Sequence, residues 1–319
     1  MDNYREDVYT LNDIIHSACL FNKTPKLALV YLSSEGIEIY SLNDFHKSIC
    51  SIETEHRVNL VSVSKNDRYL VASGSLGYNG CVAIYETHGF SLRFKIELWS
   101  FDSQLHQLTW DTRHLLVYDD GYIHVYDNTN DQFELNFNVS LDLQSYDAEI
   151  HQNSDYNLYS NLSTAYNLSI KEKKLRKLNI GEHDEILGIL RRQNLALIHR
   201  NNYEVILFNL DTEDIIQRVD WLSLWMHIHV SDDDNLVIIE NELPMRDPKI
   251  QLSLCKLNCL AEQPVNLFDS FESILIGFTG FNSELIAFNH NEIIAIRMAT
   301  KKYVIEAKET TVEQLIFSN

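Results

Sequence analysis

Two histidines separated by one residue are the strongest candidate for metal chemistry in this sequence. His227 and His229 flank Ile228 in an apolar stretch, and residues two apart on a β-strand share one face. Two imidazoles on one face can bind the same metal, but a zinc site needs a third or fourth ligand. The nearest acids, Asp232–Asp234, fall in a turn beyond the strand. We therefore expect two hydrated histidines, no metal site and no cofactor.

Catalytic motifs are absent from the sequence. It contains no G-x-S-x-G nucleophile turn, no H-E-x-x-H zinc motif and no kinase set. The stretch GSLGYNG (74–80) has three glycines, but it lies between two apolar strand-like segments. A phosphate-binding glycine loop would precede a helix, whose N-terminus holds the anion. We interpret this stretch as a hairpin loop and expect no enzyme activity.

The charge balance is strongly acidic. Among 319 residues, 46 are acidic and 26 are Lys or Arg, so the formal net charge is -20. Such a chain repels nucleic acid and anionic membranes, since affinity for both comes from Lys and Arg. Two interpretations remain open: the charge keeps the protein in solution, or it attracts a basic protein partner.

The cysteines and the N-terminus indicate a cytoplasmic protein. Five scattered cysteines favour reduced thiols rather than a disulfide framework. The first residues, MDNYREDVYTLND, are charged and lack the apolar run of a signal peptide. No stretch approaches the roughly 18 consecutive apolar residues of a membrane helix.

A short pattern recurs along the chain. The segment GYIHVYDN (121–128) places two apolar residues on one strand face and follows them with an aromatic residue and a turn. Close copies are GIEIYSLN, GCVAIYET and YEVILFNLD, and weaker ones are TAYNLSIK, IQLSLCKL and EIIAIRMA. The residues that follow the apolar pair are Tyr40, Tyr85, Tyr126, Ser169, Phe208, Cys255 and Arg297. A period of about 40–45 residues is typical of a four-stranded propeller blade.

The other strands of each unit complete the predicted fold. An apolar first strand and a second strand precede each copy, and a more polar fourth strand follows it. A lone four-stranded sheet exposes two apolar faces, whereas sheets stacked around an axis cover one another. We predict an all-β, seven-bladed β-propeller, each blade a four-stranded antiparallel sheet, in a single domain over residues 1–319. The expected seventh outer strand is 302–307, and either 5–11 or 311–319 could complete a blade begun at the other terminus.

The endings IHVYD, VAIYE and VILFN resemble the strand ending of WD-repeat propellers, in a degenerate form. The Gly-His dipeptide of that family is absent, and no tryptophan occupies the aromatic position. The resemblance covers most of the chain and transfers no specific functional residue. It implies a platform that assembles proteins, usually without catalysis.

Acidic residues mark the connections from each fourth strand to the next unit, which share one face of a propeller. The turns on the opposite face hold more bases: Lys23, Lys26, Lys65, Arg68, Arg113, Arg191 and Arg192. We predict that the acidic face binds a basic protein partner. The candidate acids are Glu53, Glu55, Asp102, Asp142, Asp147, Glu182, Asp184, Glu185, Asp220, Asp269, Glu272 and Glu309.

The segment NELPMRDPK (241–249) is the longest expected loop on that acidic face. Leu243 and Met245 could supply an apolar anchor amid charge, which is a usual composition of a binding hot spot. The basic run KEKKLRKLN (171–179) is expected on an outer strand, where lysines discourage strand-to-strand association.

The sequence favours a non-catalytic interaction platform. One alternative is an inhibitor or immunity protein that neutralises a basic toxin or nuclease. Another is a propeller enzyme or ligand binder with its site at the channel mouth, near His227 and His229. We expect no nucleic-acid or membrane partner.

Overall fold

The computed structural model describes most of the chain as strands and tight turns. From residue 219 onward, and at 5–10, 44–46, 106–107 and 149–152, it describes the backbone course only. The described residues are 5–10, 14–32, 36–76, 79–98, 106–109, 111–119, 121–141, 149–152, 155–160, 164–181, 184–190, 193–200, 204–219, 226–230, 236–243, 249–256, 265–271, 274–278, 284–289 and 292–297.

The described residues form seven four-stranded antiparallel sheets. The first three contain β2 (Ile15–Leu20), β3 (Lys26–Tyr31), β4 (Gly36–Ser41) and β5 (Asp44–Glu53); β6 (Arg57–Val63), β7 (Tyr69–Leu76), β8 (Asn79–Glu86) and β9 (Ser91–Leu98); and β10 (His106–Leu108), β11 (His114–Asp119), β12 (Tyr122–Thr129) and β13 (Gln132–Ser140).

The next two sheets contain β14 (Glu149–Gln152), β15 (Asn157–Ser160), β16 (Ala165–Ser169) and β17 (Lys174–Lys177); and β18 (Glu185–Ile189), β19 (Leu195–Arg200), β20 (Glu204–Asn209) and β21 (Ile215–Val219). The last two contain β22 (Met226–Val230), β23 (Leu236–Leu243), β24 (Lys249–Lys256) and β25 (Val265–Phe271); and β26 (Ile274–Phe278), β27 (Glu284–Asn289), β28 (Glu292–Arg297) and β1 (Arg5–Thr10).

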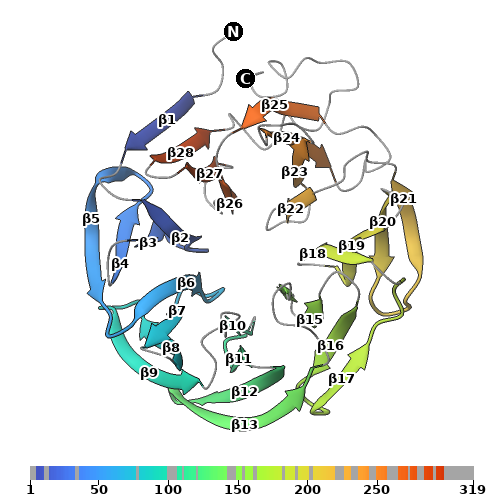
Figure 1. The fold of residues 1–319 in the computed structure, drawn as a ribbon, viewed down its shortest axis with the longest axis horizontal. Coiled ribbons are helices and arrows are strands. Elements are labelled where there is room, and N and C mark those ends of the chain that lie inside the picture. Colours follow the sequence, from blue (N-terminus) through green and yellow to red (C-terminus); the bar gives the residue numbers. More distant parts are fainter. Residues whose placement is uncertain are drawn as a thin grey trace.

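The sheets are arranged around a central axis, with the first strand of each nearest the centre (Figure 1). Neighbouring first strands contact each other, as β2 does with β6 and β26. The predicted all-β class and the four-stranded antiparallel units are therefore confirmed. Strand order follows the sequence in every described sheet except the one that holds β1.

The N-terminal strand completes the last sheet. β1 pairs antiparallel with β28, in a register that runs from Arg5 opposite Arg297 to Thr10 opposite Glu292. The sequence left open which terminus would complete a blade, and the structure assigns this role to the N-terminal one. The segment 302–307, predicted as the outer strand of this sheet, lies outside the described residues, and β1 takes its place beside β28.

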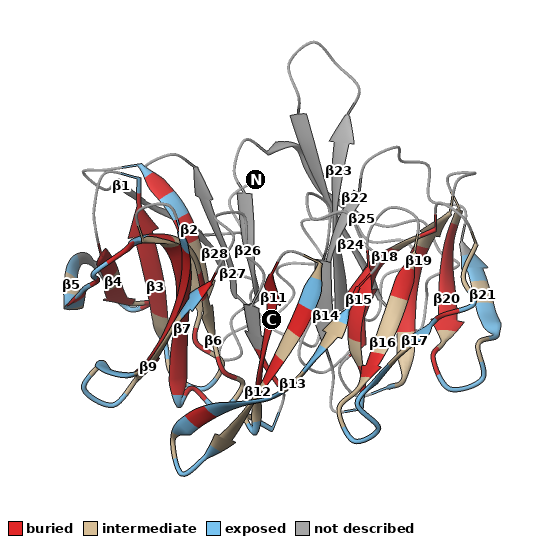
Figure 2. Ribbon diagram, turned by 60° about the horizontal axis from the view of Figure 1, so that its bottom comes forward, coloured by how far each residue is buried: buried red, intermediate tan, exposed pale blue. Residues whose placement is uncertain are grey.

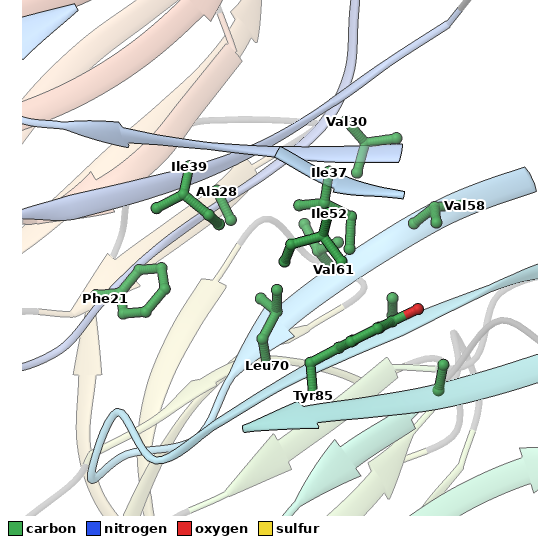
Figure 3. Packing of buried hydrophobic residues seen from close by; sticks show 12 residues of the cluster. Phe21, Ala28, Val30, Ile37, Ile39, Ile52, Val58, Val61, Leu70 and Tyr85 are labelled. Carbon is green, nitrogen blue, oxygen red and sulfur yellow. The ribbon is translucent and has the colours of Figure 1, made fainter. Parts of the chain in front are cut away.

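The second strands β3, β7 and β11 are buried on both faces, as stacking of sheets requires. In β7, Leu70 and Ala72 belong to a cluster shared with the first sheet, which also contains Ile37 and Ile39. Figure 3 shows Leu70 with these two isoleucines. The alternate residues of β7 pack into a second cluster shared with the third sheet. Figure 2 shows the result: red marks the inner strands, and pale blue marks outer strand β21 and the turns. Because about 25 cal/mol is gained per Å² of apolar surface removed from water, each sheet is stable only between its neighbours.

A β-bulge recurs at the four aromatic positions of the sequence repeat. The pairing of third and fourth strands shifts register just before each of these residues, which are Tyr40, Tyr85, Tyr126 and Phe208. The outer strand thereby gains one unpaired residue, which is Ile49 in β5 and Ile216 in β21. Bulges bend and twist an edge strand, so they hinder pairing with another molecule's edge.

A buried carboxylate joins the first two sheets. Asp67, in the turn between β6 and β7, is 7% exposed. It accepts hydrogen bonds from the backbone N–H groups of Asn22 (2.6 Å), Lys23 (2.7 Å) and Thr24 (2.7 Å). The Thr24 hydroxyl donates to it at 3.0 Å. One side chain therefore fixes the whole turn of the neighbouring sheet.

Tyrosine hydroxyls join two other pairs of sheets in one common way. Tyr69, at the start of β7, donates to Asp131 in the turn between β12 and β13. Tyr156, just before β15, donates at 2.6 Å to Asp211 in the turn between β20 and β21. The hydrogen bonds from Tyr156 and then Asn194 lower the pKa of Asp211, while burial and the bond to Asp211 raise the pKa of Tyr156. These contacts hold the Asp211 carboxyl in its charged form.

Replacing Asp67 with Asn should weaken the contact between the first two sheets. The amide keeps the size of the side chain but presents one acceptor oxygen and an NH₂ group that opposes the backbone donors. We expect Asp67→Asn to lower the free energy of unfolding by about 2–3 kcal/mol, measured by urea denaturation. The exposed Glu172→Gln is the control and should change it by less than about 0.5 kcal/mol. Equal effects would contradict this role of Asp67.

Removing residues 1–10 should leave the outer edge of β28 unpaired. We expect a lower thermal midpoint and association through the exposed strand edge, detected by light scattering after size exclusion. A peptide of residues 1–10 added in trans should restore the monomer, and a scrambled peptide should not. A truncated protein with unchanged midpoint and mass would contradict the pairing of β1 with β28.

Candidate protein-binding face

The alternating direction of the strands divides the connections between two faces. Links from second to third strands, and from each fourth strand to the next sheet, lie on one side, which we call the loop face. Turns from first to second and from third to fourth strands lie on the other side, which we call the turn face. The acids predicted to bind a partner belong to connections of the loop face.

About half of the candidate acids and one apolar candidate lie outside the described residues. Among the described candidates, Glu53 and Glu55 are exposed, Asp184 is buried and Glu185 is half-buried. Leu243 and Asp269 belong to strands that are described by their backbone only. The candidates outside the described residues are Asp102, Asp142, Asp147, Glu182, Asp220, Met245, Glu272 and Glu309.

The strand alternation of β5 continues into the connection and turns two acids outward. Ile52, Thr54 and His56 are buried, and Glu53 and Glu55 between them are exposed. The Thr54 hydroxyl donates at 2.7 Å to the backbone oxygen of His56 and so spans the bend at 55–56. Burial lowers the pKa of His56, so its imidazole stays neutral beneath the acids. The result is a fixed display of two carboxylates at the end of sheet β2–β5.

One of these carboxylates pairs with a lysine of the second sheet. Lys95 Nζ lies 2.8 Å from Glu55 Oε2, and the Glu55 side chain is 78% exposed. The hydrogen bond from Lys95 and its charge lower the pKa of Glu55, which therefore remains ionised. An exposed pair of this kind exchanges readily with another cation, because such pairs contribute little to stability.

Asp184 has a structural role and is not available as a surface acid, contrary to its place among the predicted contacts. Its side chain is 5% exposed and lies 3.1 Å from Arg200 Nε. It also accepts a hydrogen bond from the Gly181 backbone at 2.9 Å. A Cβ at Gly181 would lie 2.8 Å from the Asp184 carboxylate, so a larger residue there would displace this carboxylate from its position. The acid secures the connection into β18.

Three further candidates lie in strands rather than in loops. Glu185 is the first residue of β18 and pairs with His199. β25 continues through Asp269 to Phe271. β23 extends to Leu243, which lies opposite Lys249, so the expected long loop shortens to 244–248, outside the described residues. The strands β23 and β25 therefore continue into residues that the sequence analysis placed in loops.

Exposed apolar side chains on the loop face were missed by the sequence analysis. Ile14 and Leu32 are each 45% exposed, and the Leu32 N–H donates to the Ile14 oxygen at 2.9 Å. Tyr122 is 46% exposed and follows Gly121, whose φ of 79° allows the tight turn before β12. Its ring lies 6.4 Å from that of His124. Each residue stands at a strand end, where alternation does not reveal exposure.

The candidates for other chemistry remain without a described site. His227 and His229 lie in β22, of which only the backbone is described. Within the described residues, no group of three or more His, Cys, Asp or Glu could hold a metal ion. The glycine-rich stretch 74–80 joins β7 and β8 in a hairpin, with Leu76 opposite Asn79, as predicted. In the part of the chain that the structure describes, no helix is long and apolar enough to cross a membrane.

The basic run 171–177 lies partly in a turn and partly in β17. Lys173 donates to Asn136 at 2.7 Å and lies over the Phe137 ring at 5.3 Å from its centroid. Lys174 and Lys177 are exposed on the outer strand, which agrees with the expectation of a solvated sheet edge.

Comparison with known proteins supports the architecture. The shared fold is a β-propeller. One such match is to a chain of the crystal structure of a mitotic checkpoint complex, with a TM-score of 0.66 and 12% sequence identity, over 92% of this chain and 94% of that chain. No protein-family model and no curated protein matches the sequence. At this identity the likeness concerns the fold alone.

Replacing Asp184 with Asn should separate structure from binding. It would leave Arg200 facing a neutral amide inside a largely buried contact. We expect Asp184→Asn to lower the free energy of unfolding by about 2–3 kcal/mol in urea denaturation. The exposed Glu53→Gln should change it by less than about 0.5 kcal/mol. A stable Asp184→Asn protein would show that this carboxylate does not secure the connection.

Proposed function

We propose that this chain is a closed seven-bladed β-propeller that acts as a non-catalytic platform for a basic protein partner, bound through the loop face. The sheet count, the ring seen in Figure 1 and the pairing of β1 with β28 support closure. Two features support binding rather than catalysis: the sequence lacks the catalytic motifs named above, and the fold is a propeller. The cysteine content supports a cytoplasmic location.

One observation carries this proposal: exposed acids and exposed apolar side chains lie at the same end of one sheet. Ile14 lies just before β2 and Leu32 just after β3 of sheet β2–β5, and Glu53 ends its outer strand, opposite Gly36. Glu55 follows in the connection to the next sheet. An apolar centre with a charged rim is the usual anatomy of a protein-binding patch.

Charge and apolar contact have separate roles in this surface. The net charge of -20 draws a basic protein toward the chain and raises the association rate. Burial of Ile14 and Leu32 would slow dissociation, because apolar contacts are lost only when the partner leaves. A scaffold and an inhibitor of a basic protein would both use this arrangement.

Charge reversal on the loop face should remove the partner. We expect Glu53→Lys with Glu55→Lys to reduce capture of loop-face partners by about tenfold, because two attractive charges become repulsive. The control is Glu134→Lys with Glu172→Lys, which changes net charge equally but lies on β13 and on the turn face. The three proteins serve as baits in parallel, and bound proteins are quantified by mass spectrometry.

Partners of the loop face should remain on the control bait and should be basic. The proposal fails if both variants lose the same proteins, because the effect then follows total charge rather than place. It also fails if the proteins lost with Glu53 and Glu55 are mostly acidic. Thermal midpoints of the three baits verify that each is folded.

A further inference from the structure

Three turns on the turn face form one continuous surface. They join the first and second strands of sheets β2–β5, β6–β9 and β10–β13. Asp67 binds the backbone of 22–24, which links the first turn to the second. Asn66 Nδ2 donates to the Thr112 hydroxyl at 3.3 Å, which links the second turn to the third. We call residues 21–25, 64–68, 109 and 111–113 the basic turn surface.

Cations point outward from this surface, although the chain as a whole is strongly acidic. Lys23, Arg68 and Arg113 are exposed. Lys65 Nζ lies 3.5 Å from the Asn22 side-chain oxygen, so its ammonium group lies beside the first turn. The acid of the second turn, Asp67, is buried and turned inward toward backbone donors. In the second turn, positive charge therefore faces solvent and the carboxylate faces the interior.

The acids near these cations form exposed pairs. Asp111 Oδ2 lies 3.3 Å from Arg113 Nε, and the two side chains are 50% and 78% exposed. Asp131 lies 2.7 Å from Arg68, whose side chain is 50% exposed. Exposed pairs contribute about 0–1 kcal/mol, so an incoming carboxylate can share or replace these partners.

The backbone holds the two arginines of this surface, Arg68 and Arg113, in equivalent positions. In the second turn the Ser64 hydroxyl accepts the N–H of the residue five positions later at 2.9 Å, and in the third turn the Thr109 hydroxyl does the same at 3.0 Å. A side-chain oxygen accepts the arginine N–H at 3.0 Å in both turns. The residue before each arginine has a φ of 61°. The equivalent residues are Ser64 and Thr109, Asn66 and Asp111, Asp67 and Thr112, and Arg68 and Arg113.

We infer that the basic turn surface binds an acidic peptide segment, rich in Asp or Glu, of another protein. Its arginines stand on neighbouring sheets in fixed backbone geometry, and guanidinium groups match carboxylates well. A short peptide fits better than a nucleic acid, because the cations are few and a continuous phosphate backbone needs many Lys and Arg contacts. This surface lies opposite the loop face, so the inference stands independently of the proposed function.

The test uses a fluorescein-labelled octaglutamate peptide and measures anisotropy with the full chain at low salt. We expect binding that weakens as salt increases. Lys23→Glu with Arg113→Glu should raise Kd by about tenfold, because two contacts become repulsive. The control, Arg57→Glu with Lys177→Glu, has the same net charge and changes exposed residues at loop-face strand ends. It should raise Kd by less than about twofold.

Three results would overturn this inference. The first is the absence of peptide binding at low salt. The second is equal weakening in both variants, because the effect would then come from total charge. The third is tighter binding of a labelled oligothymidylate than of the peptide, which would assign the surface to nucleic acid. If Lys23→Glu with Arg113→Glu has a lowered thermal midpoint, Lys23→Met with Arg113→Met replaces it and should raise Kd by about threefold or more.

Discussion

Every sheet of this protein depends on cover from its neighbours. The strand β7 sends alternate side chains into two different cores, one shared with the sheet before it and one with the sheet after it. The sheet that holds β7 therefore cannot bury its apolar residues alone and depends on both neighbours. Polar contacts add to this packing, and those of Asp67 and Tyr156 lie in turns or at strand ends. The strands are occupied by apolar packing, and the turns are where hydrogen bonds can add to it.

The fold was largely predictable because its signal is periodic. Alternation and the recurring aromatic position gave the strands of each unit, and the four clearest copies coincide with β-bulges. The last sheet was only partly predictable. Two segments near the termini had similar strand character, and only the pairing of β1 with β28 decides between the candidates. Pairing of residues far apart in sequence leaves no local pattern.

The candidate site was less predictable than the fold. An acid in a connection can point outward, as Glu55 does, or inward, as Asp184 does. Both lie in short segments with similar composition, and the difference arises from Arg200 on another strand. The exposure of Ile14 and Leu32 likewise depends on where β2 and β3 end. Composition therefore drew attention to the loop face. Which of its side chains point outward could be read only from the three-dimensional arrangement.

The pairing of β1 with β28 has a consequence for biosynthesis. The ribosome makes residues 5–10 well before their partners, 292–297. Until then the N-terminal strand has no ladder to join, and the last sheet cannot be completed. Early sheets can pack against one another as they emerge, but β1 has no partner strand until residues 292–297 have been made. Contacts between residues so distant in sequence are slow to form, so the final joining is the step at which a nascent chain is most exposed to wrong partners.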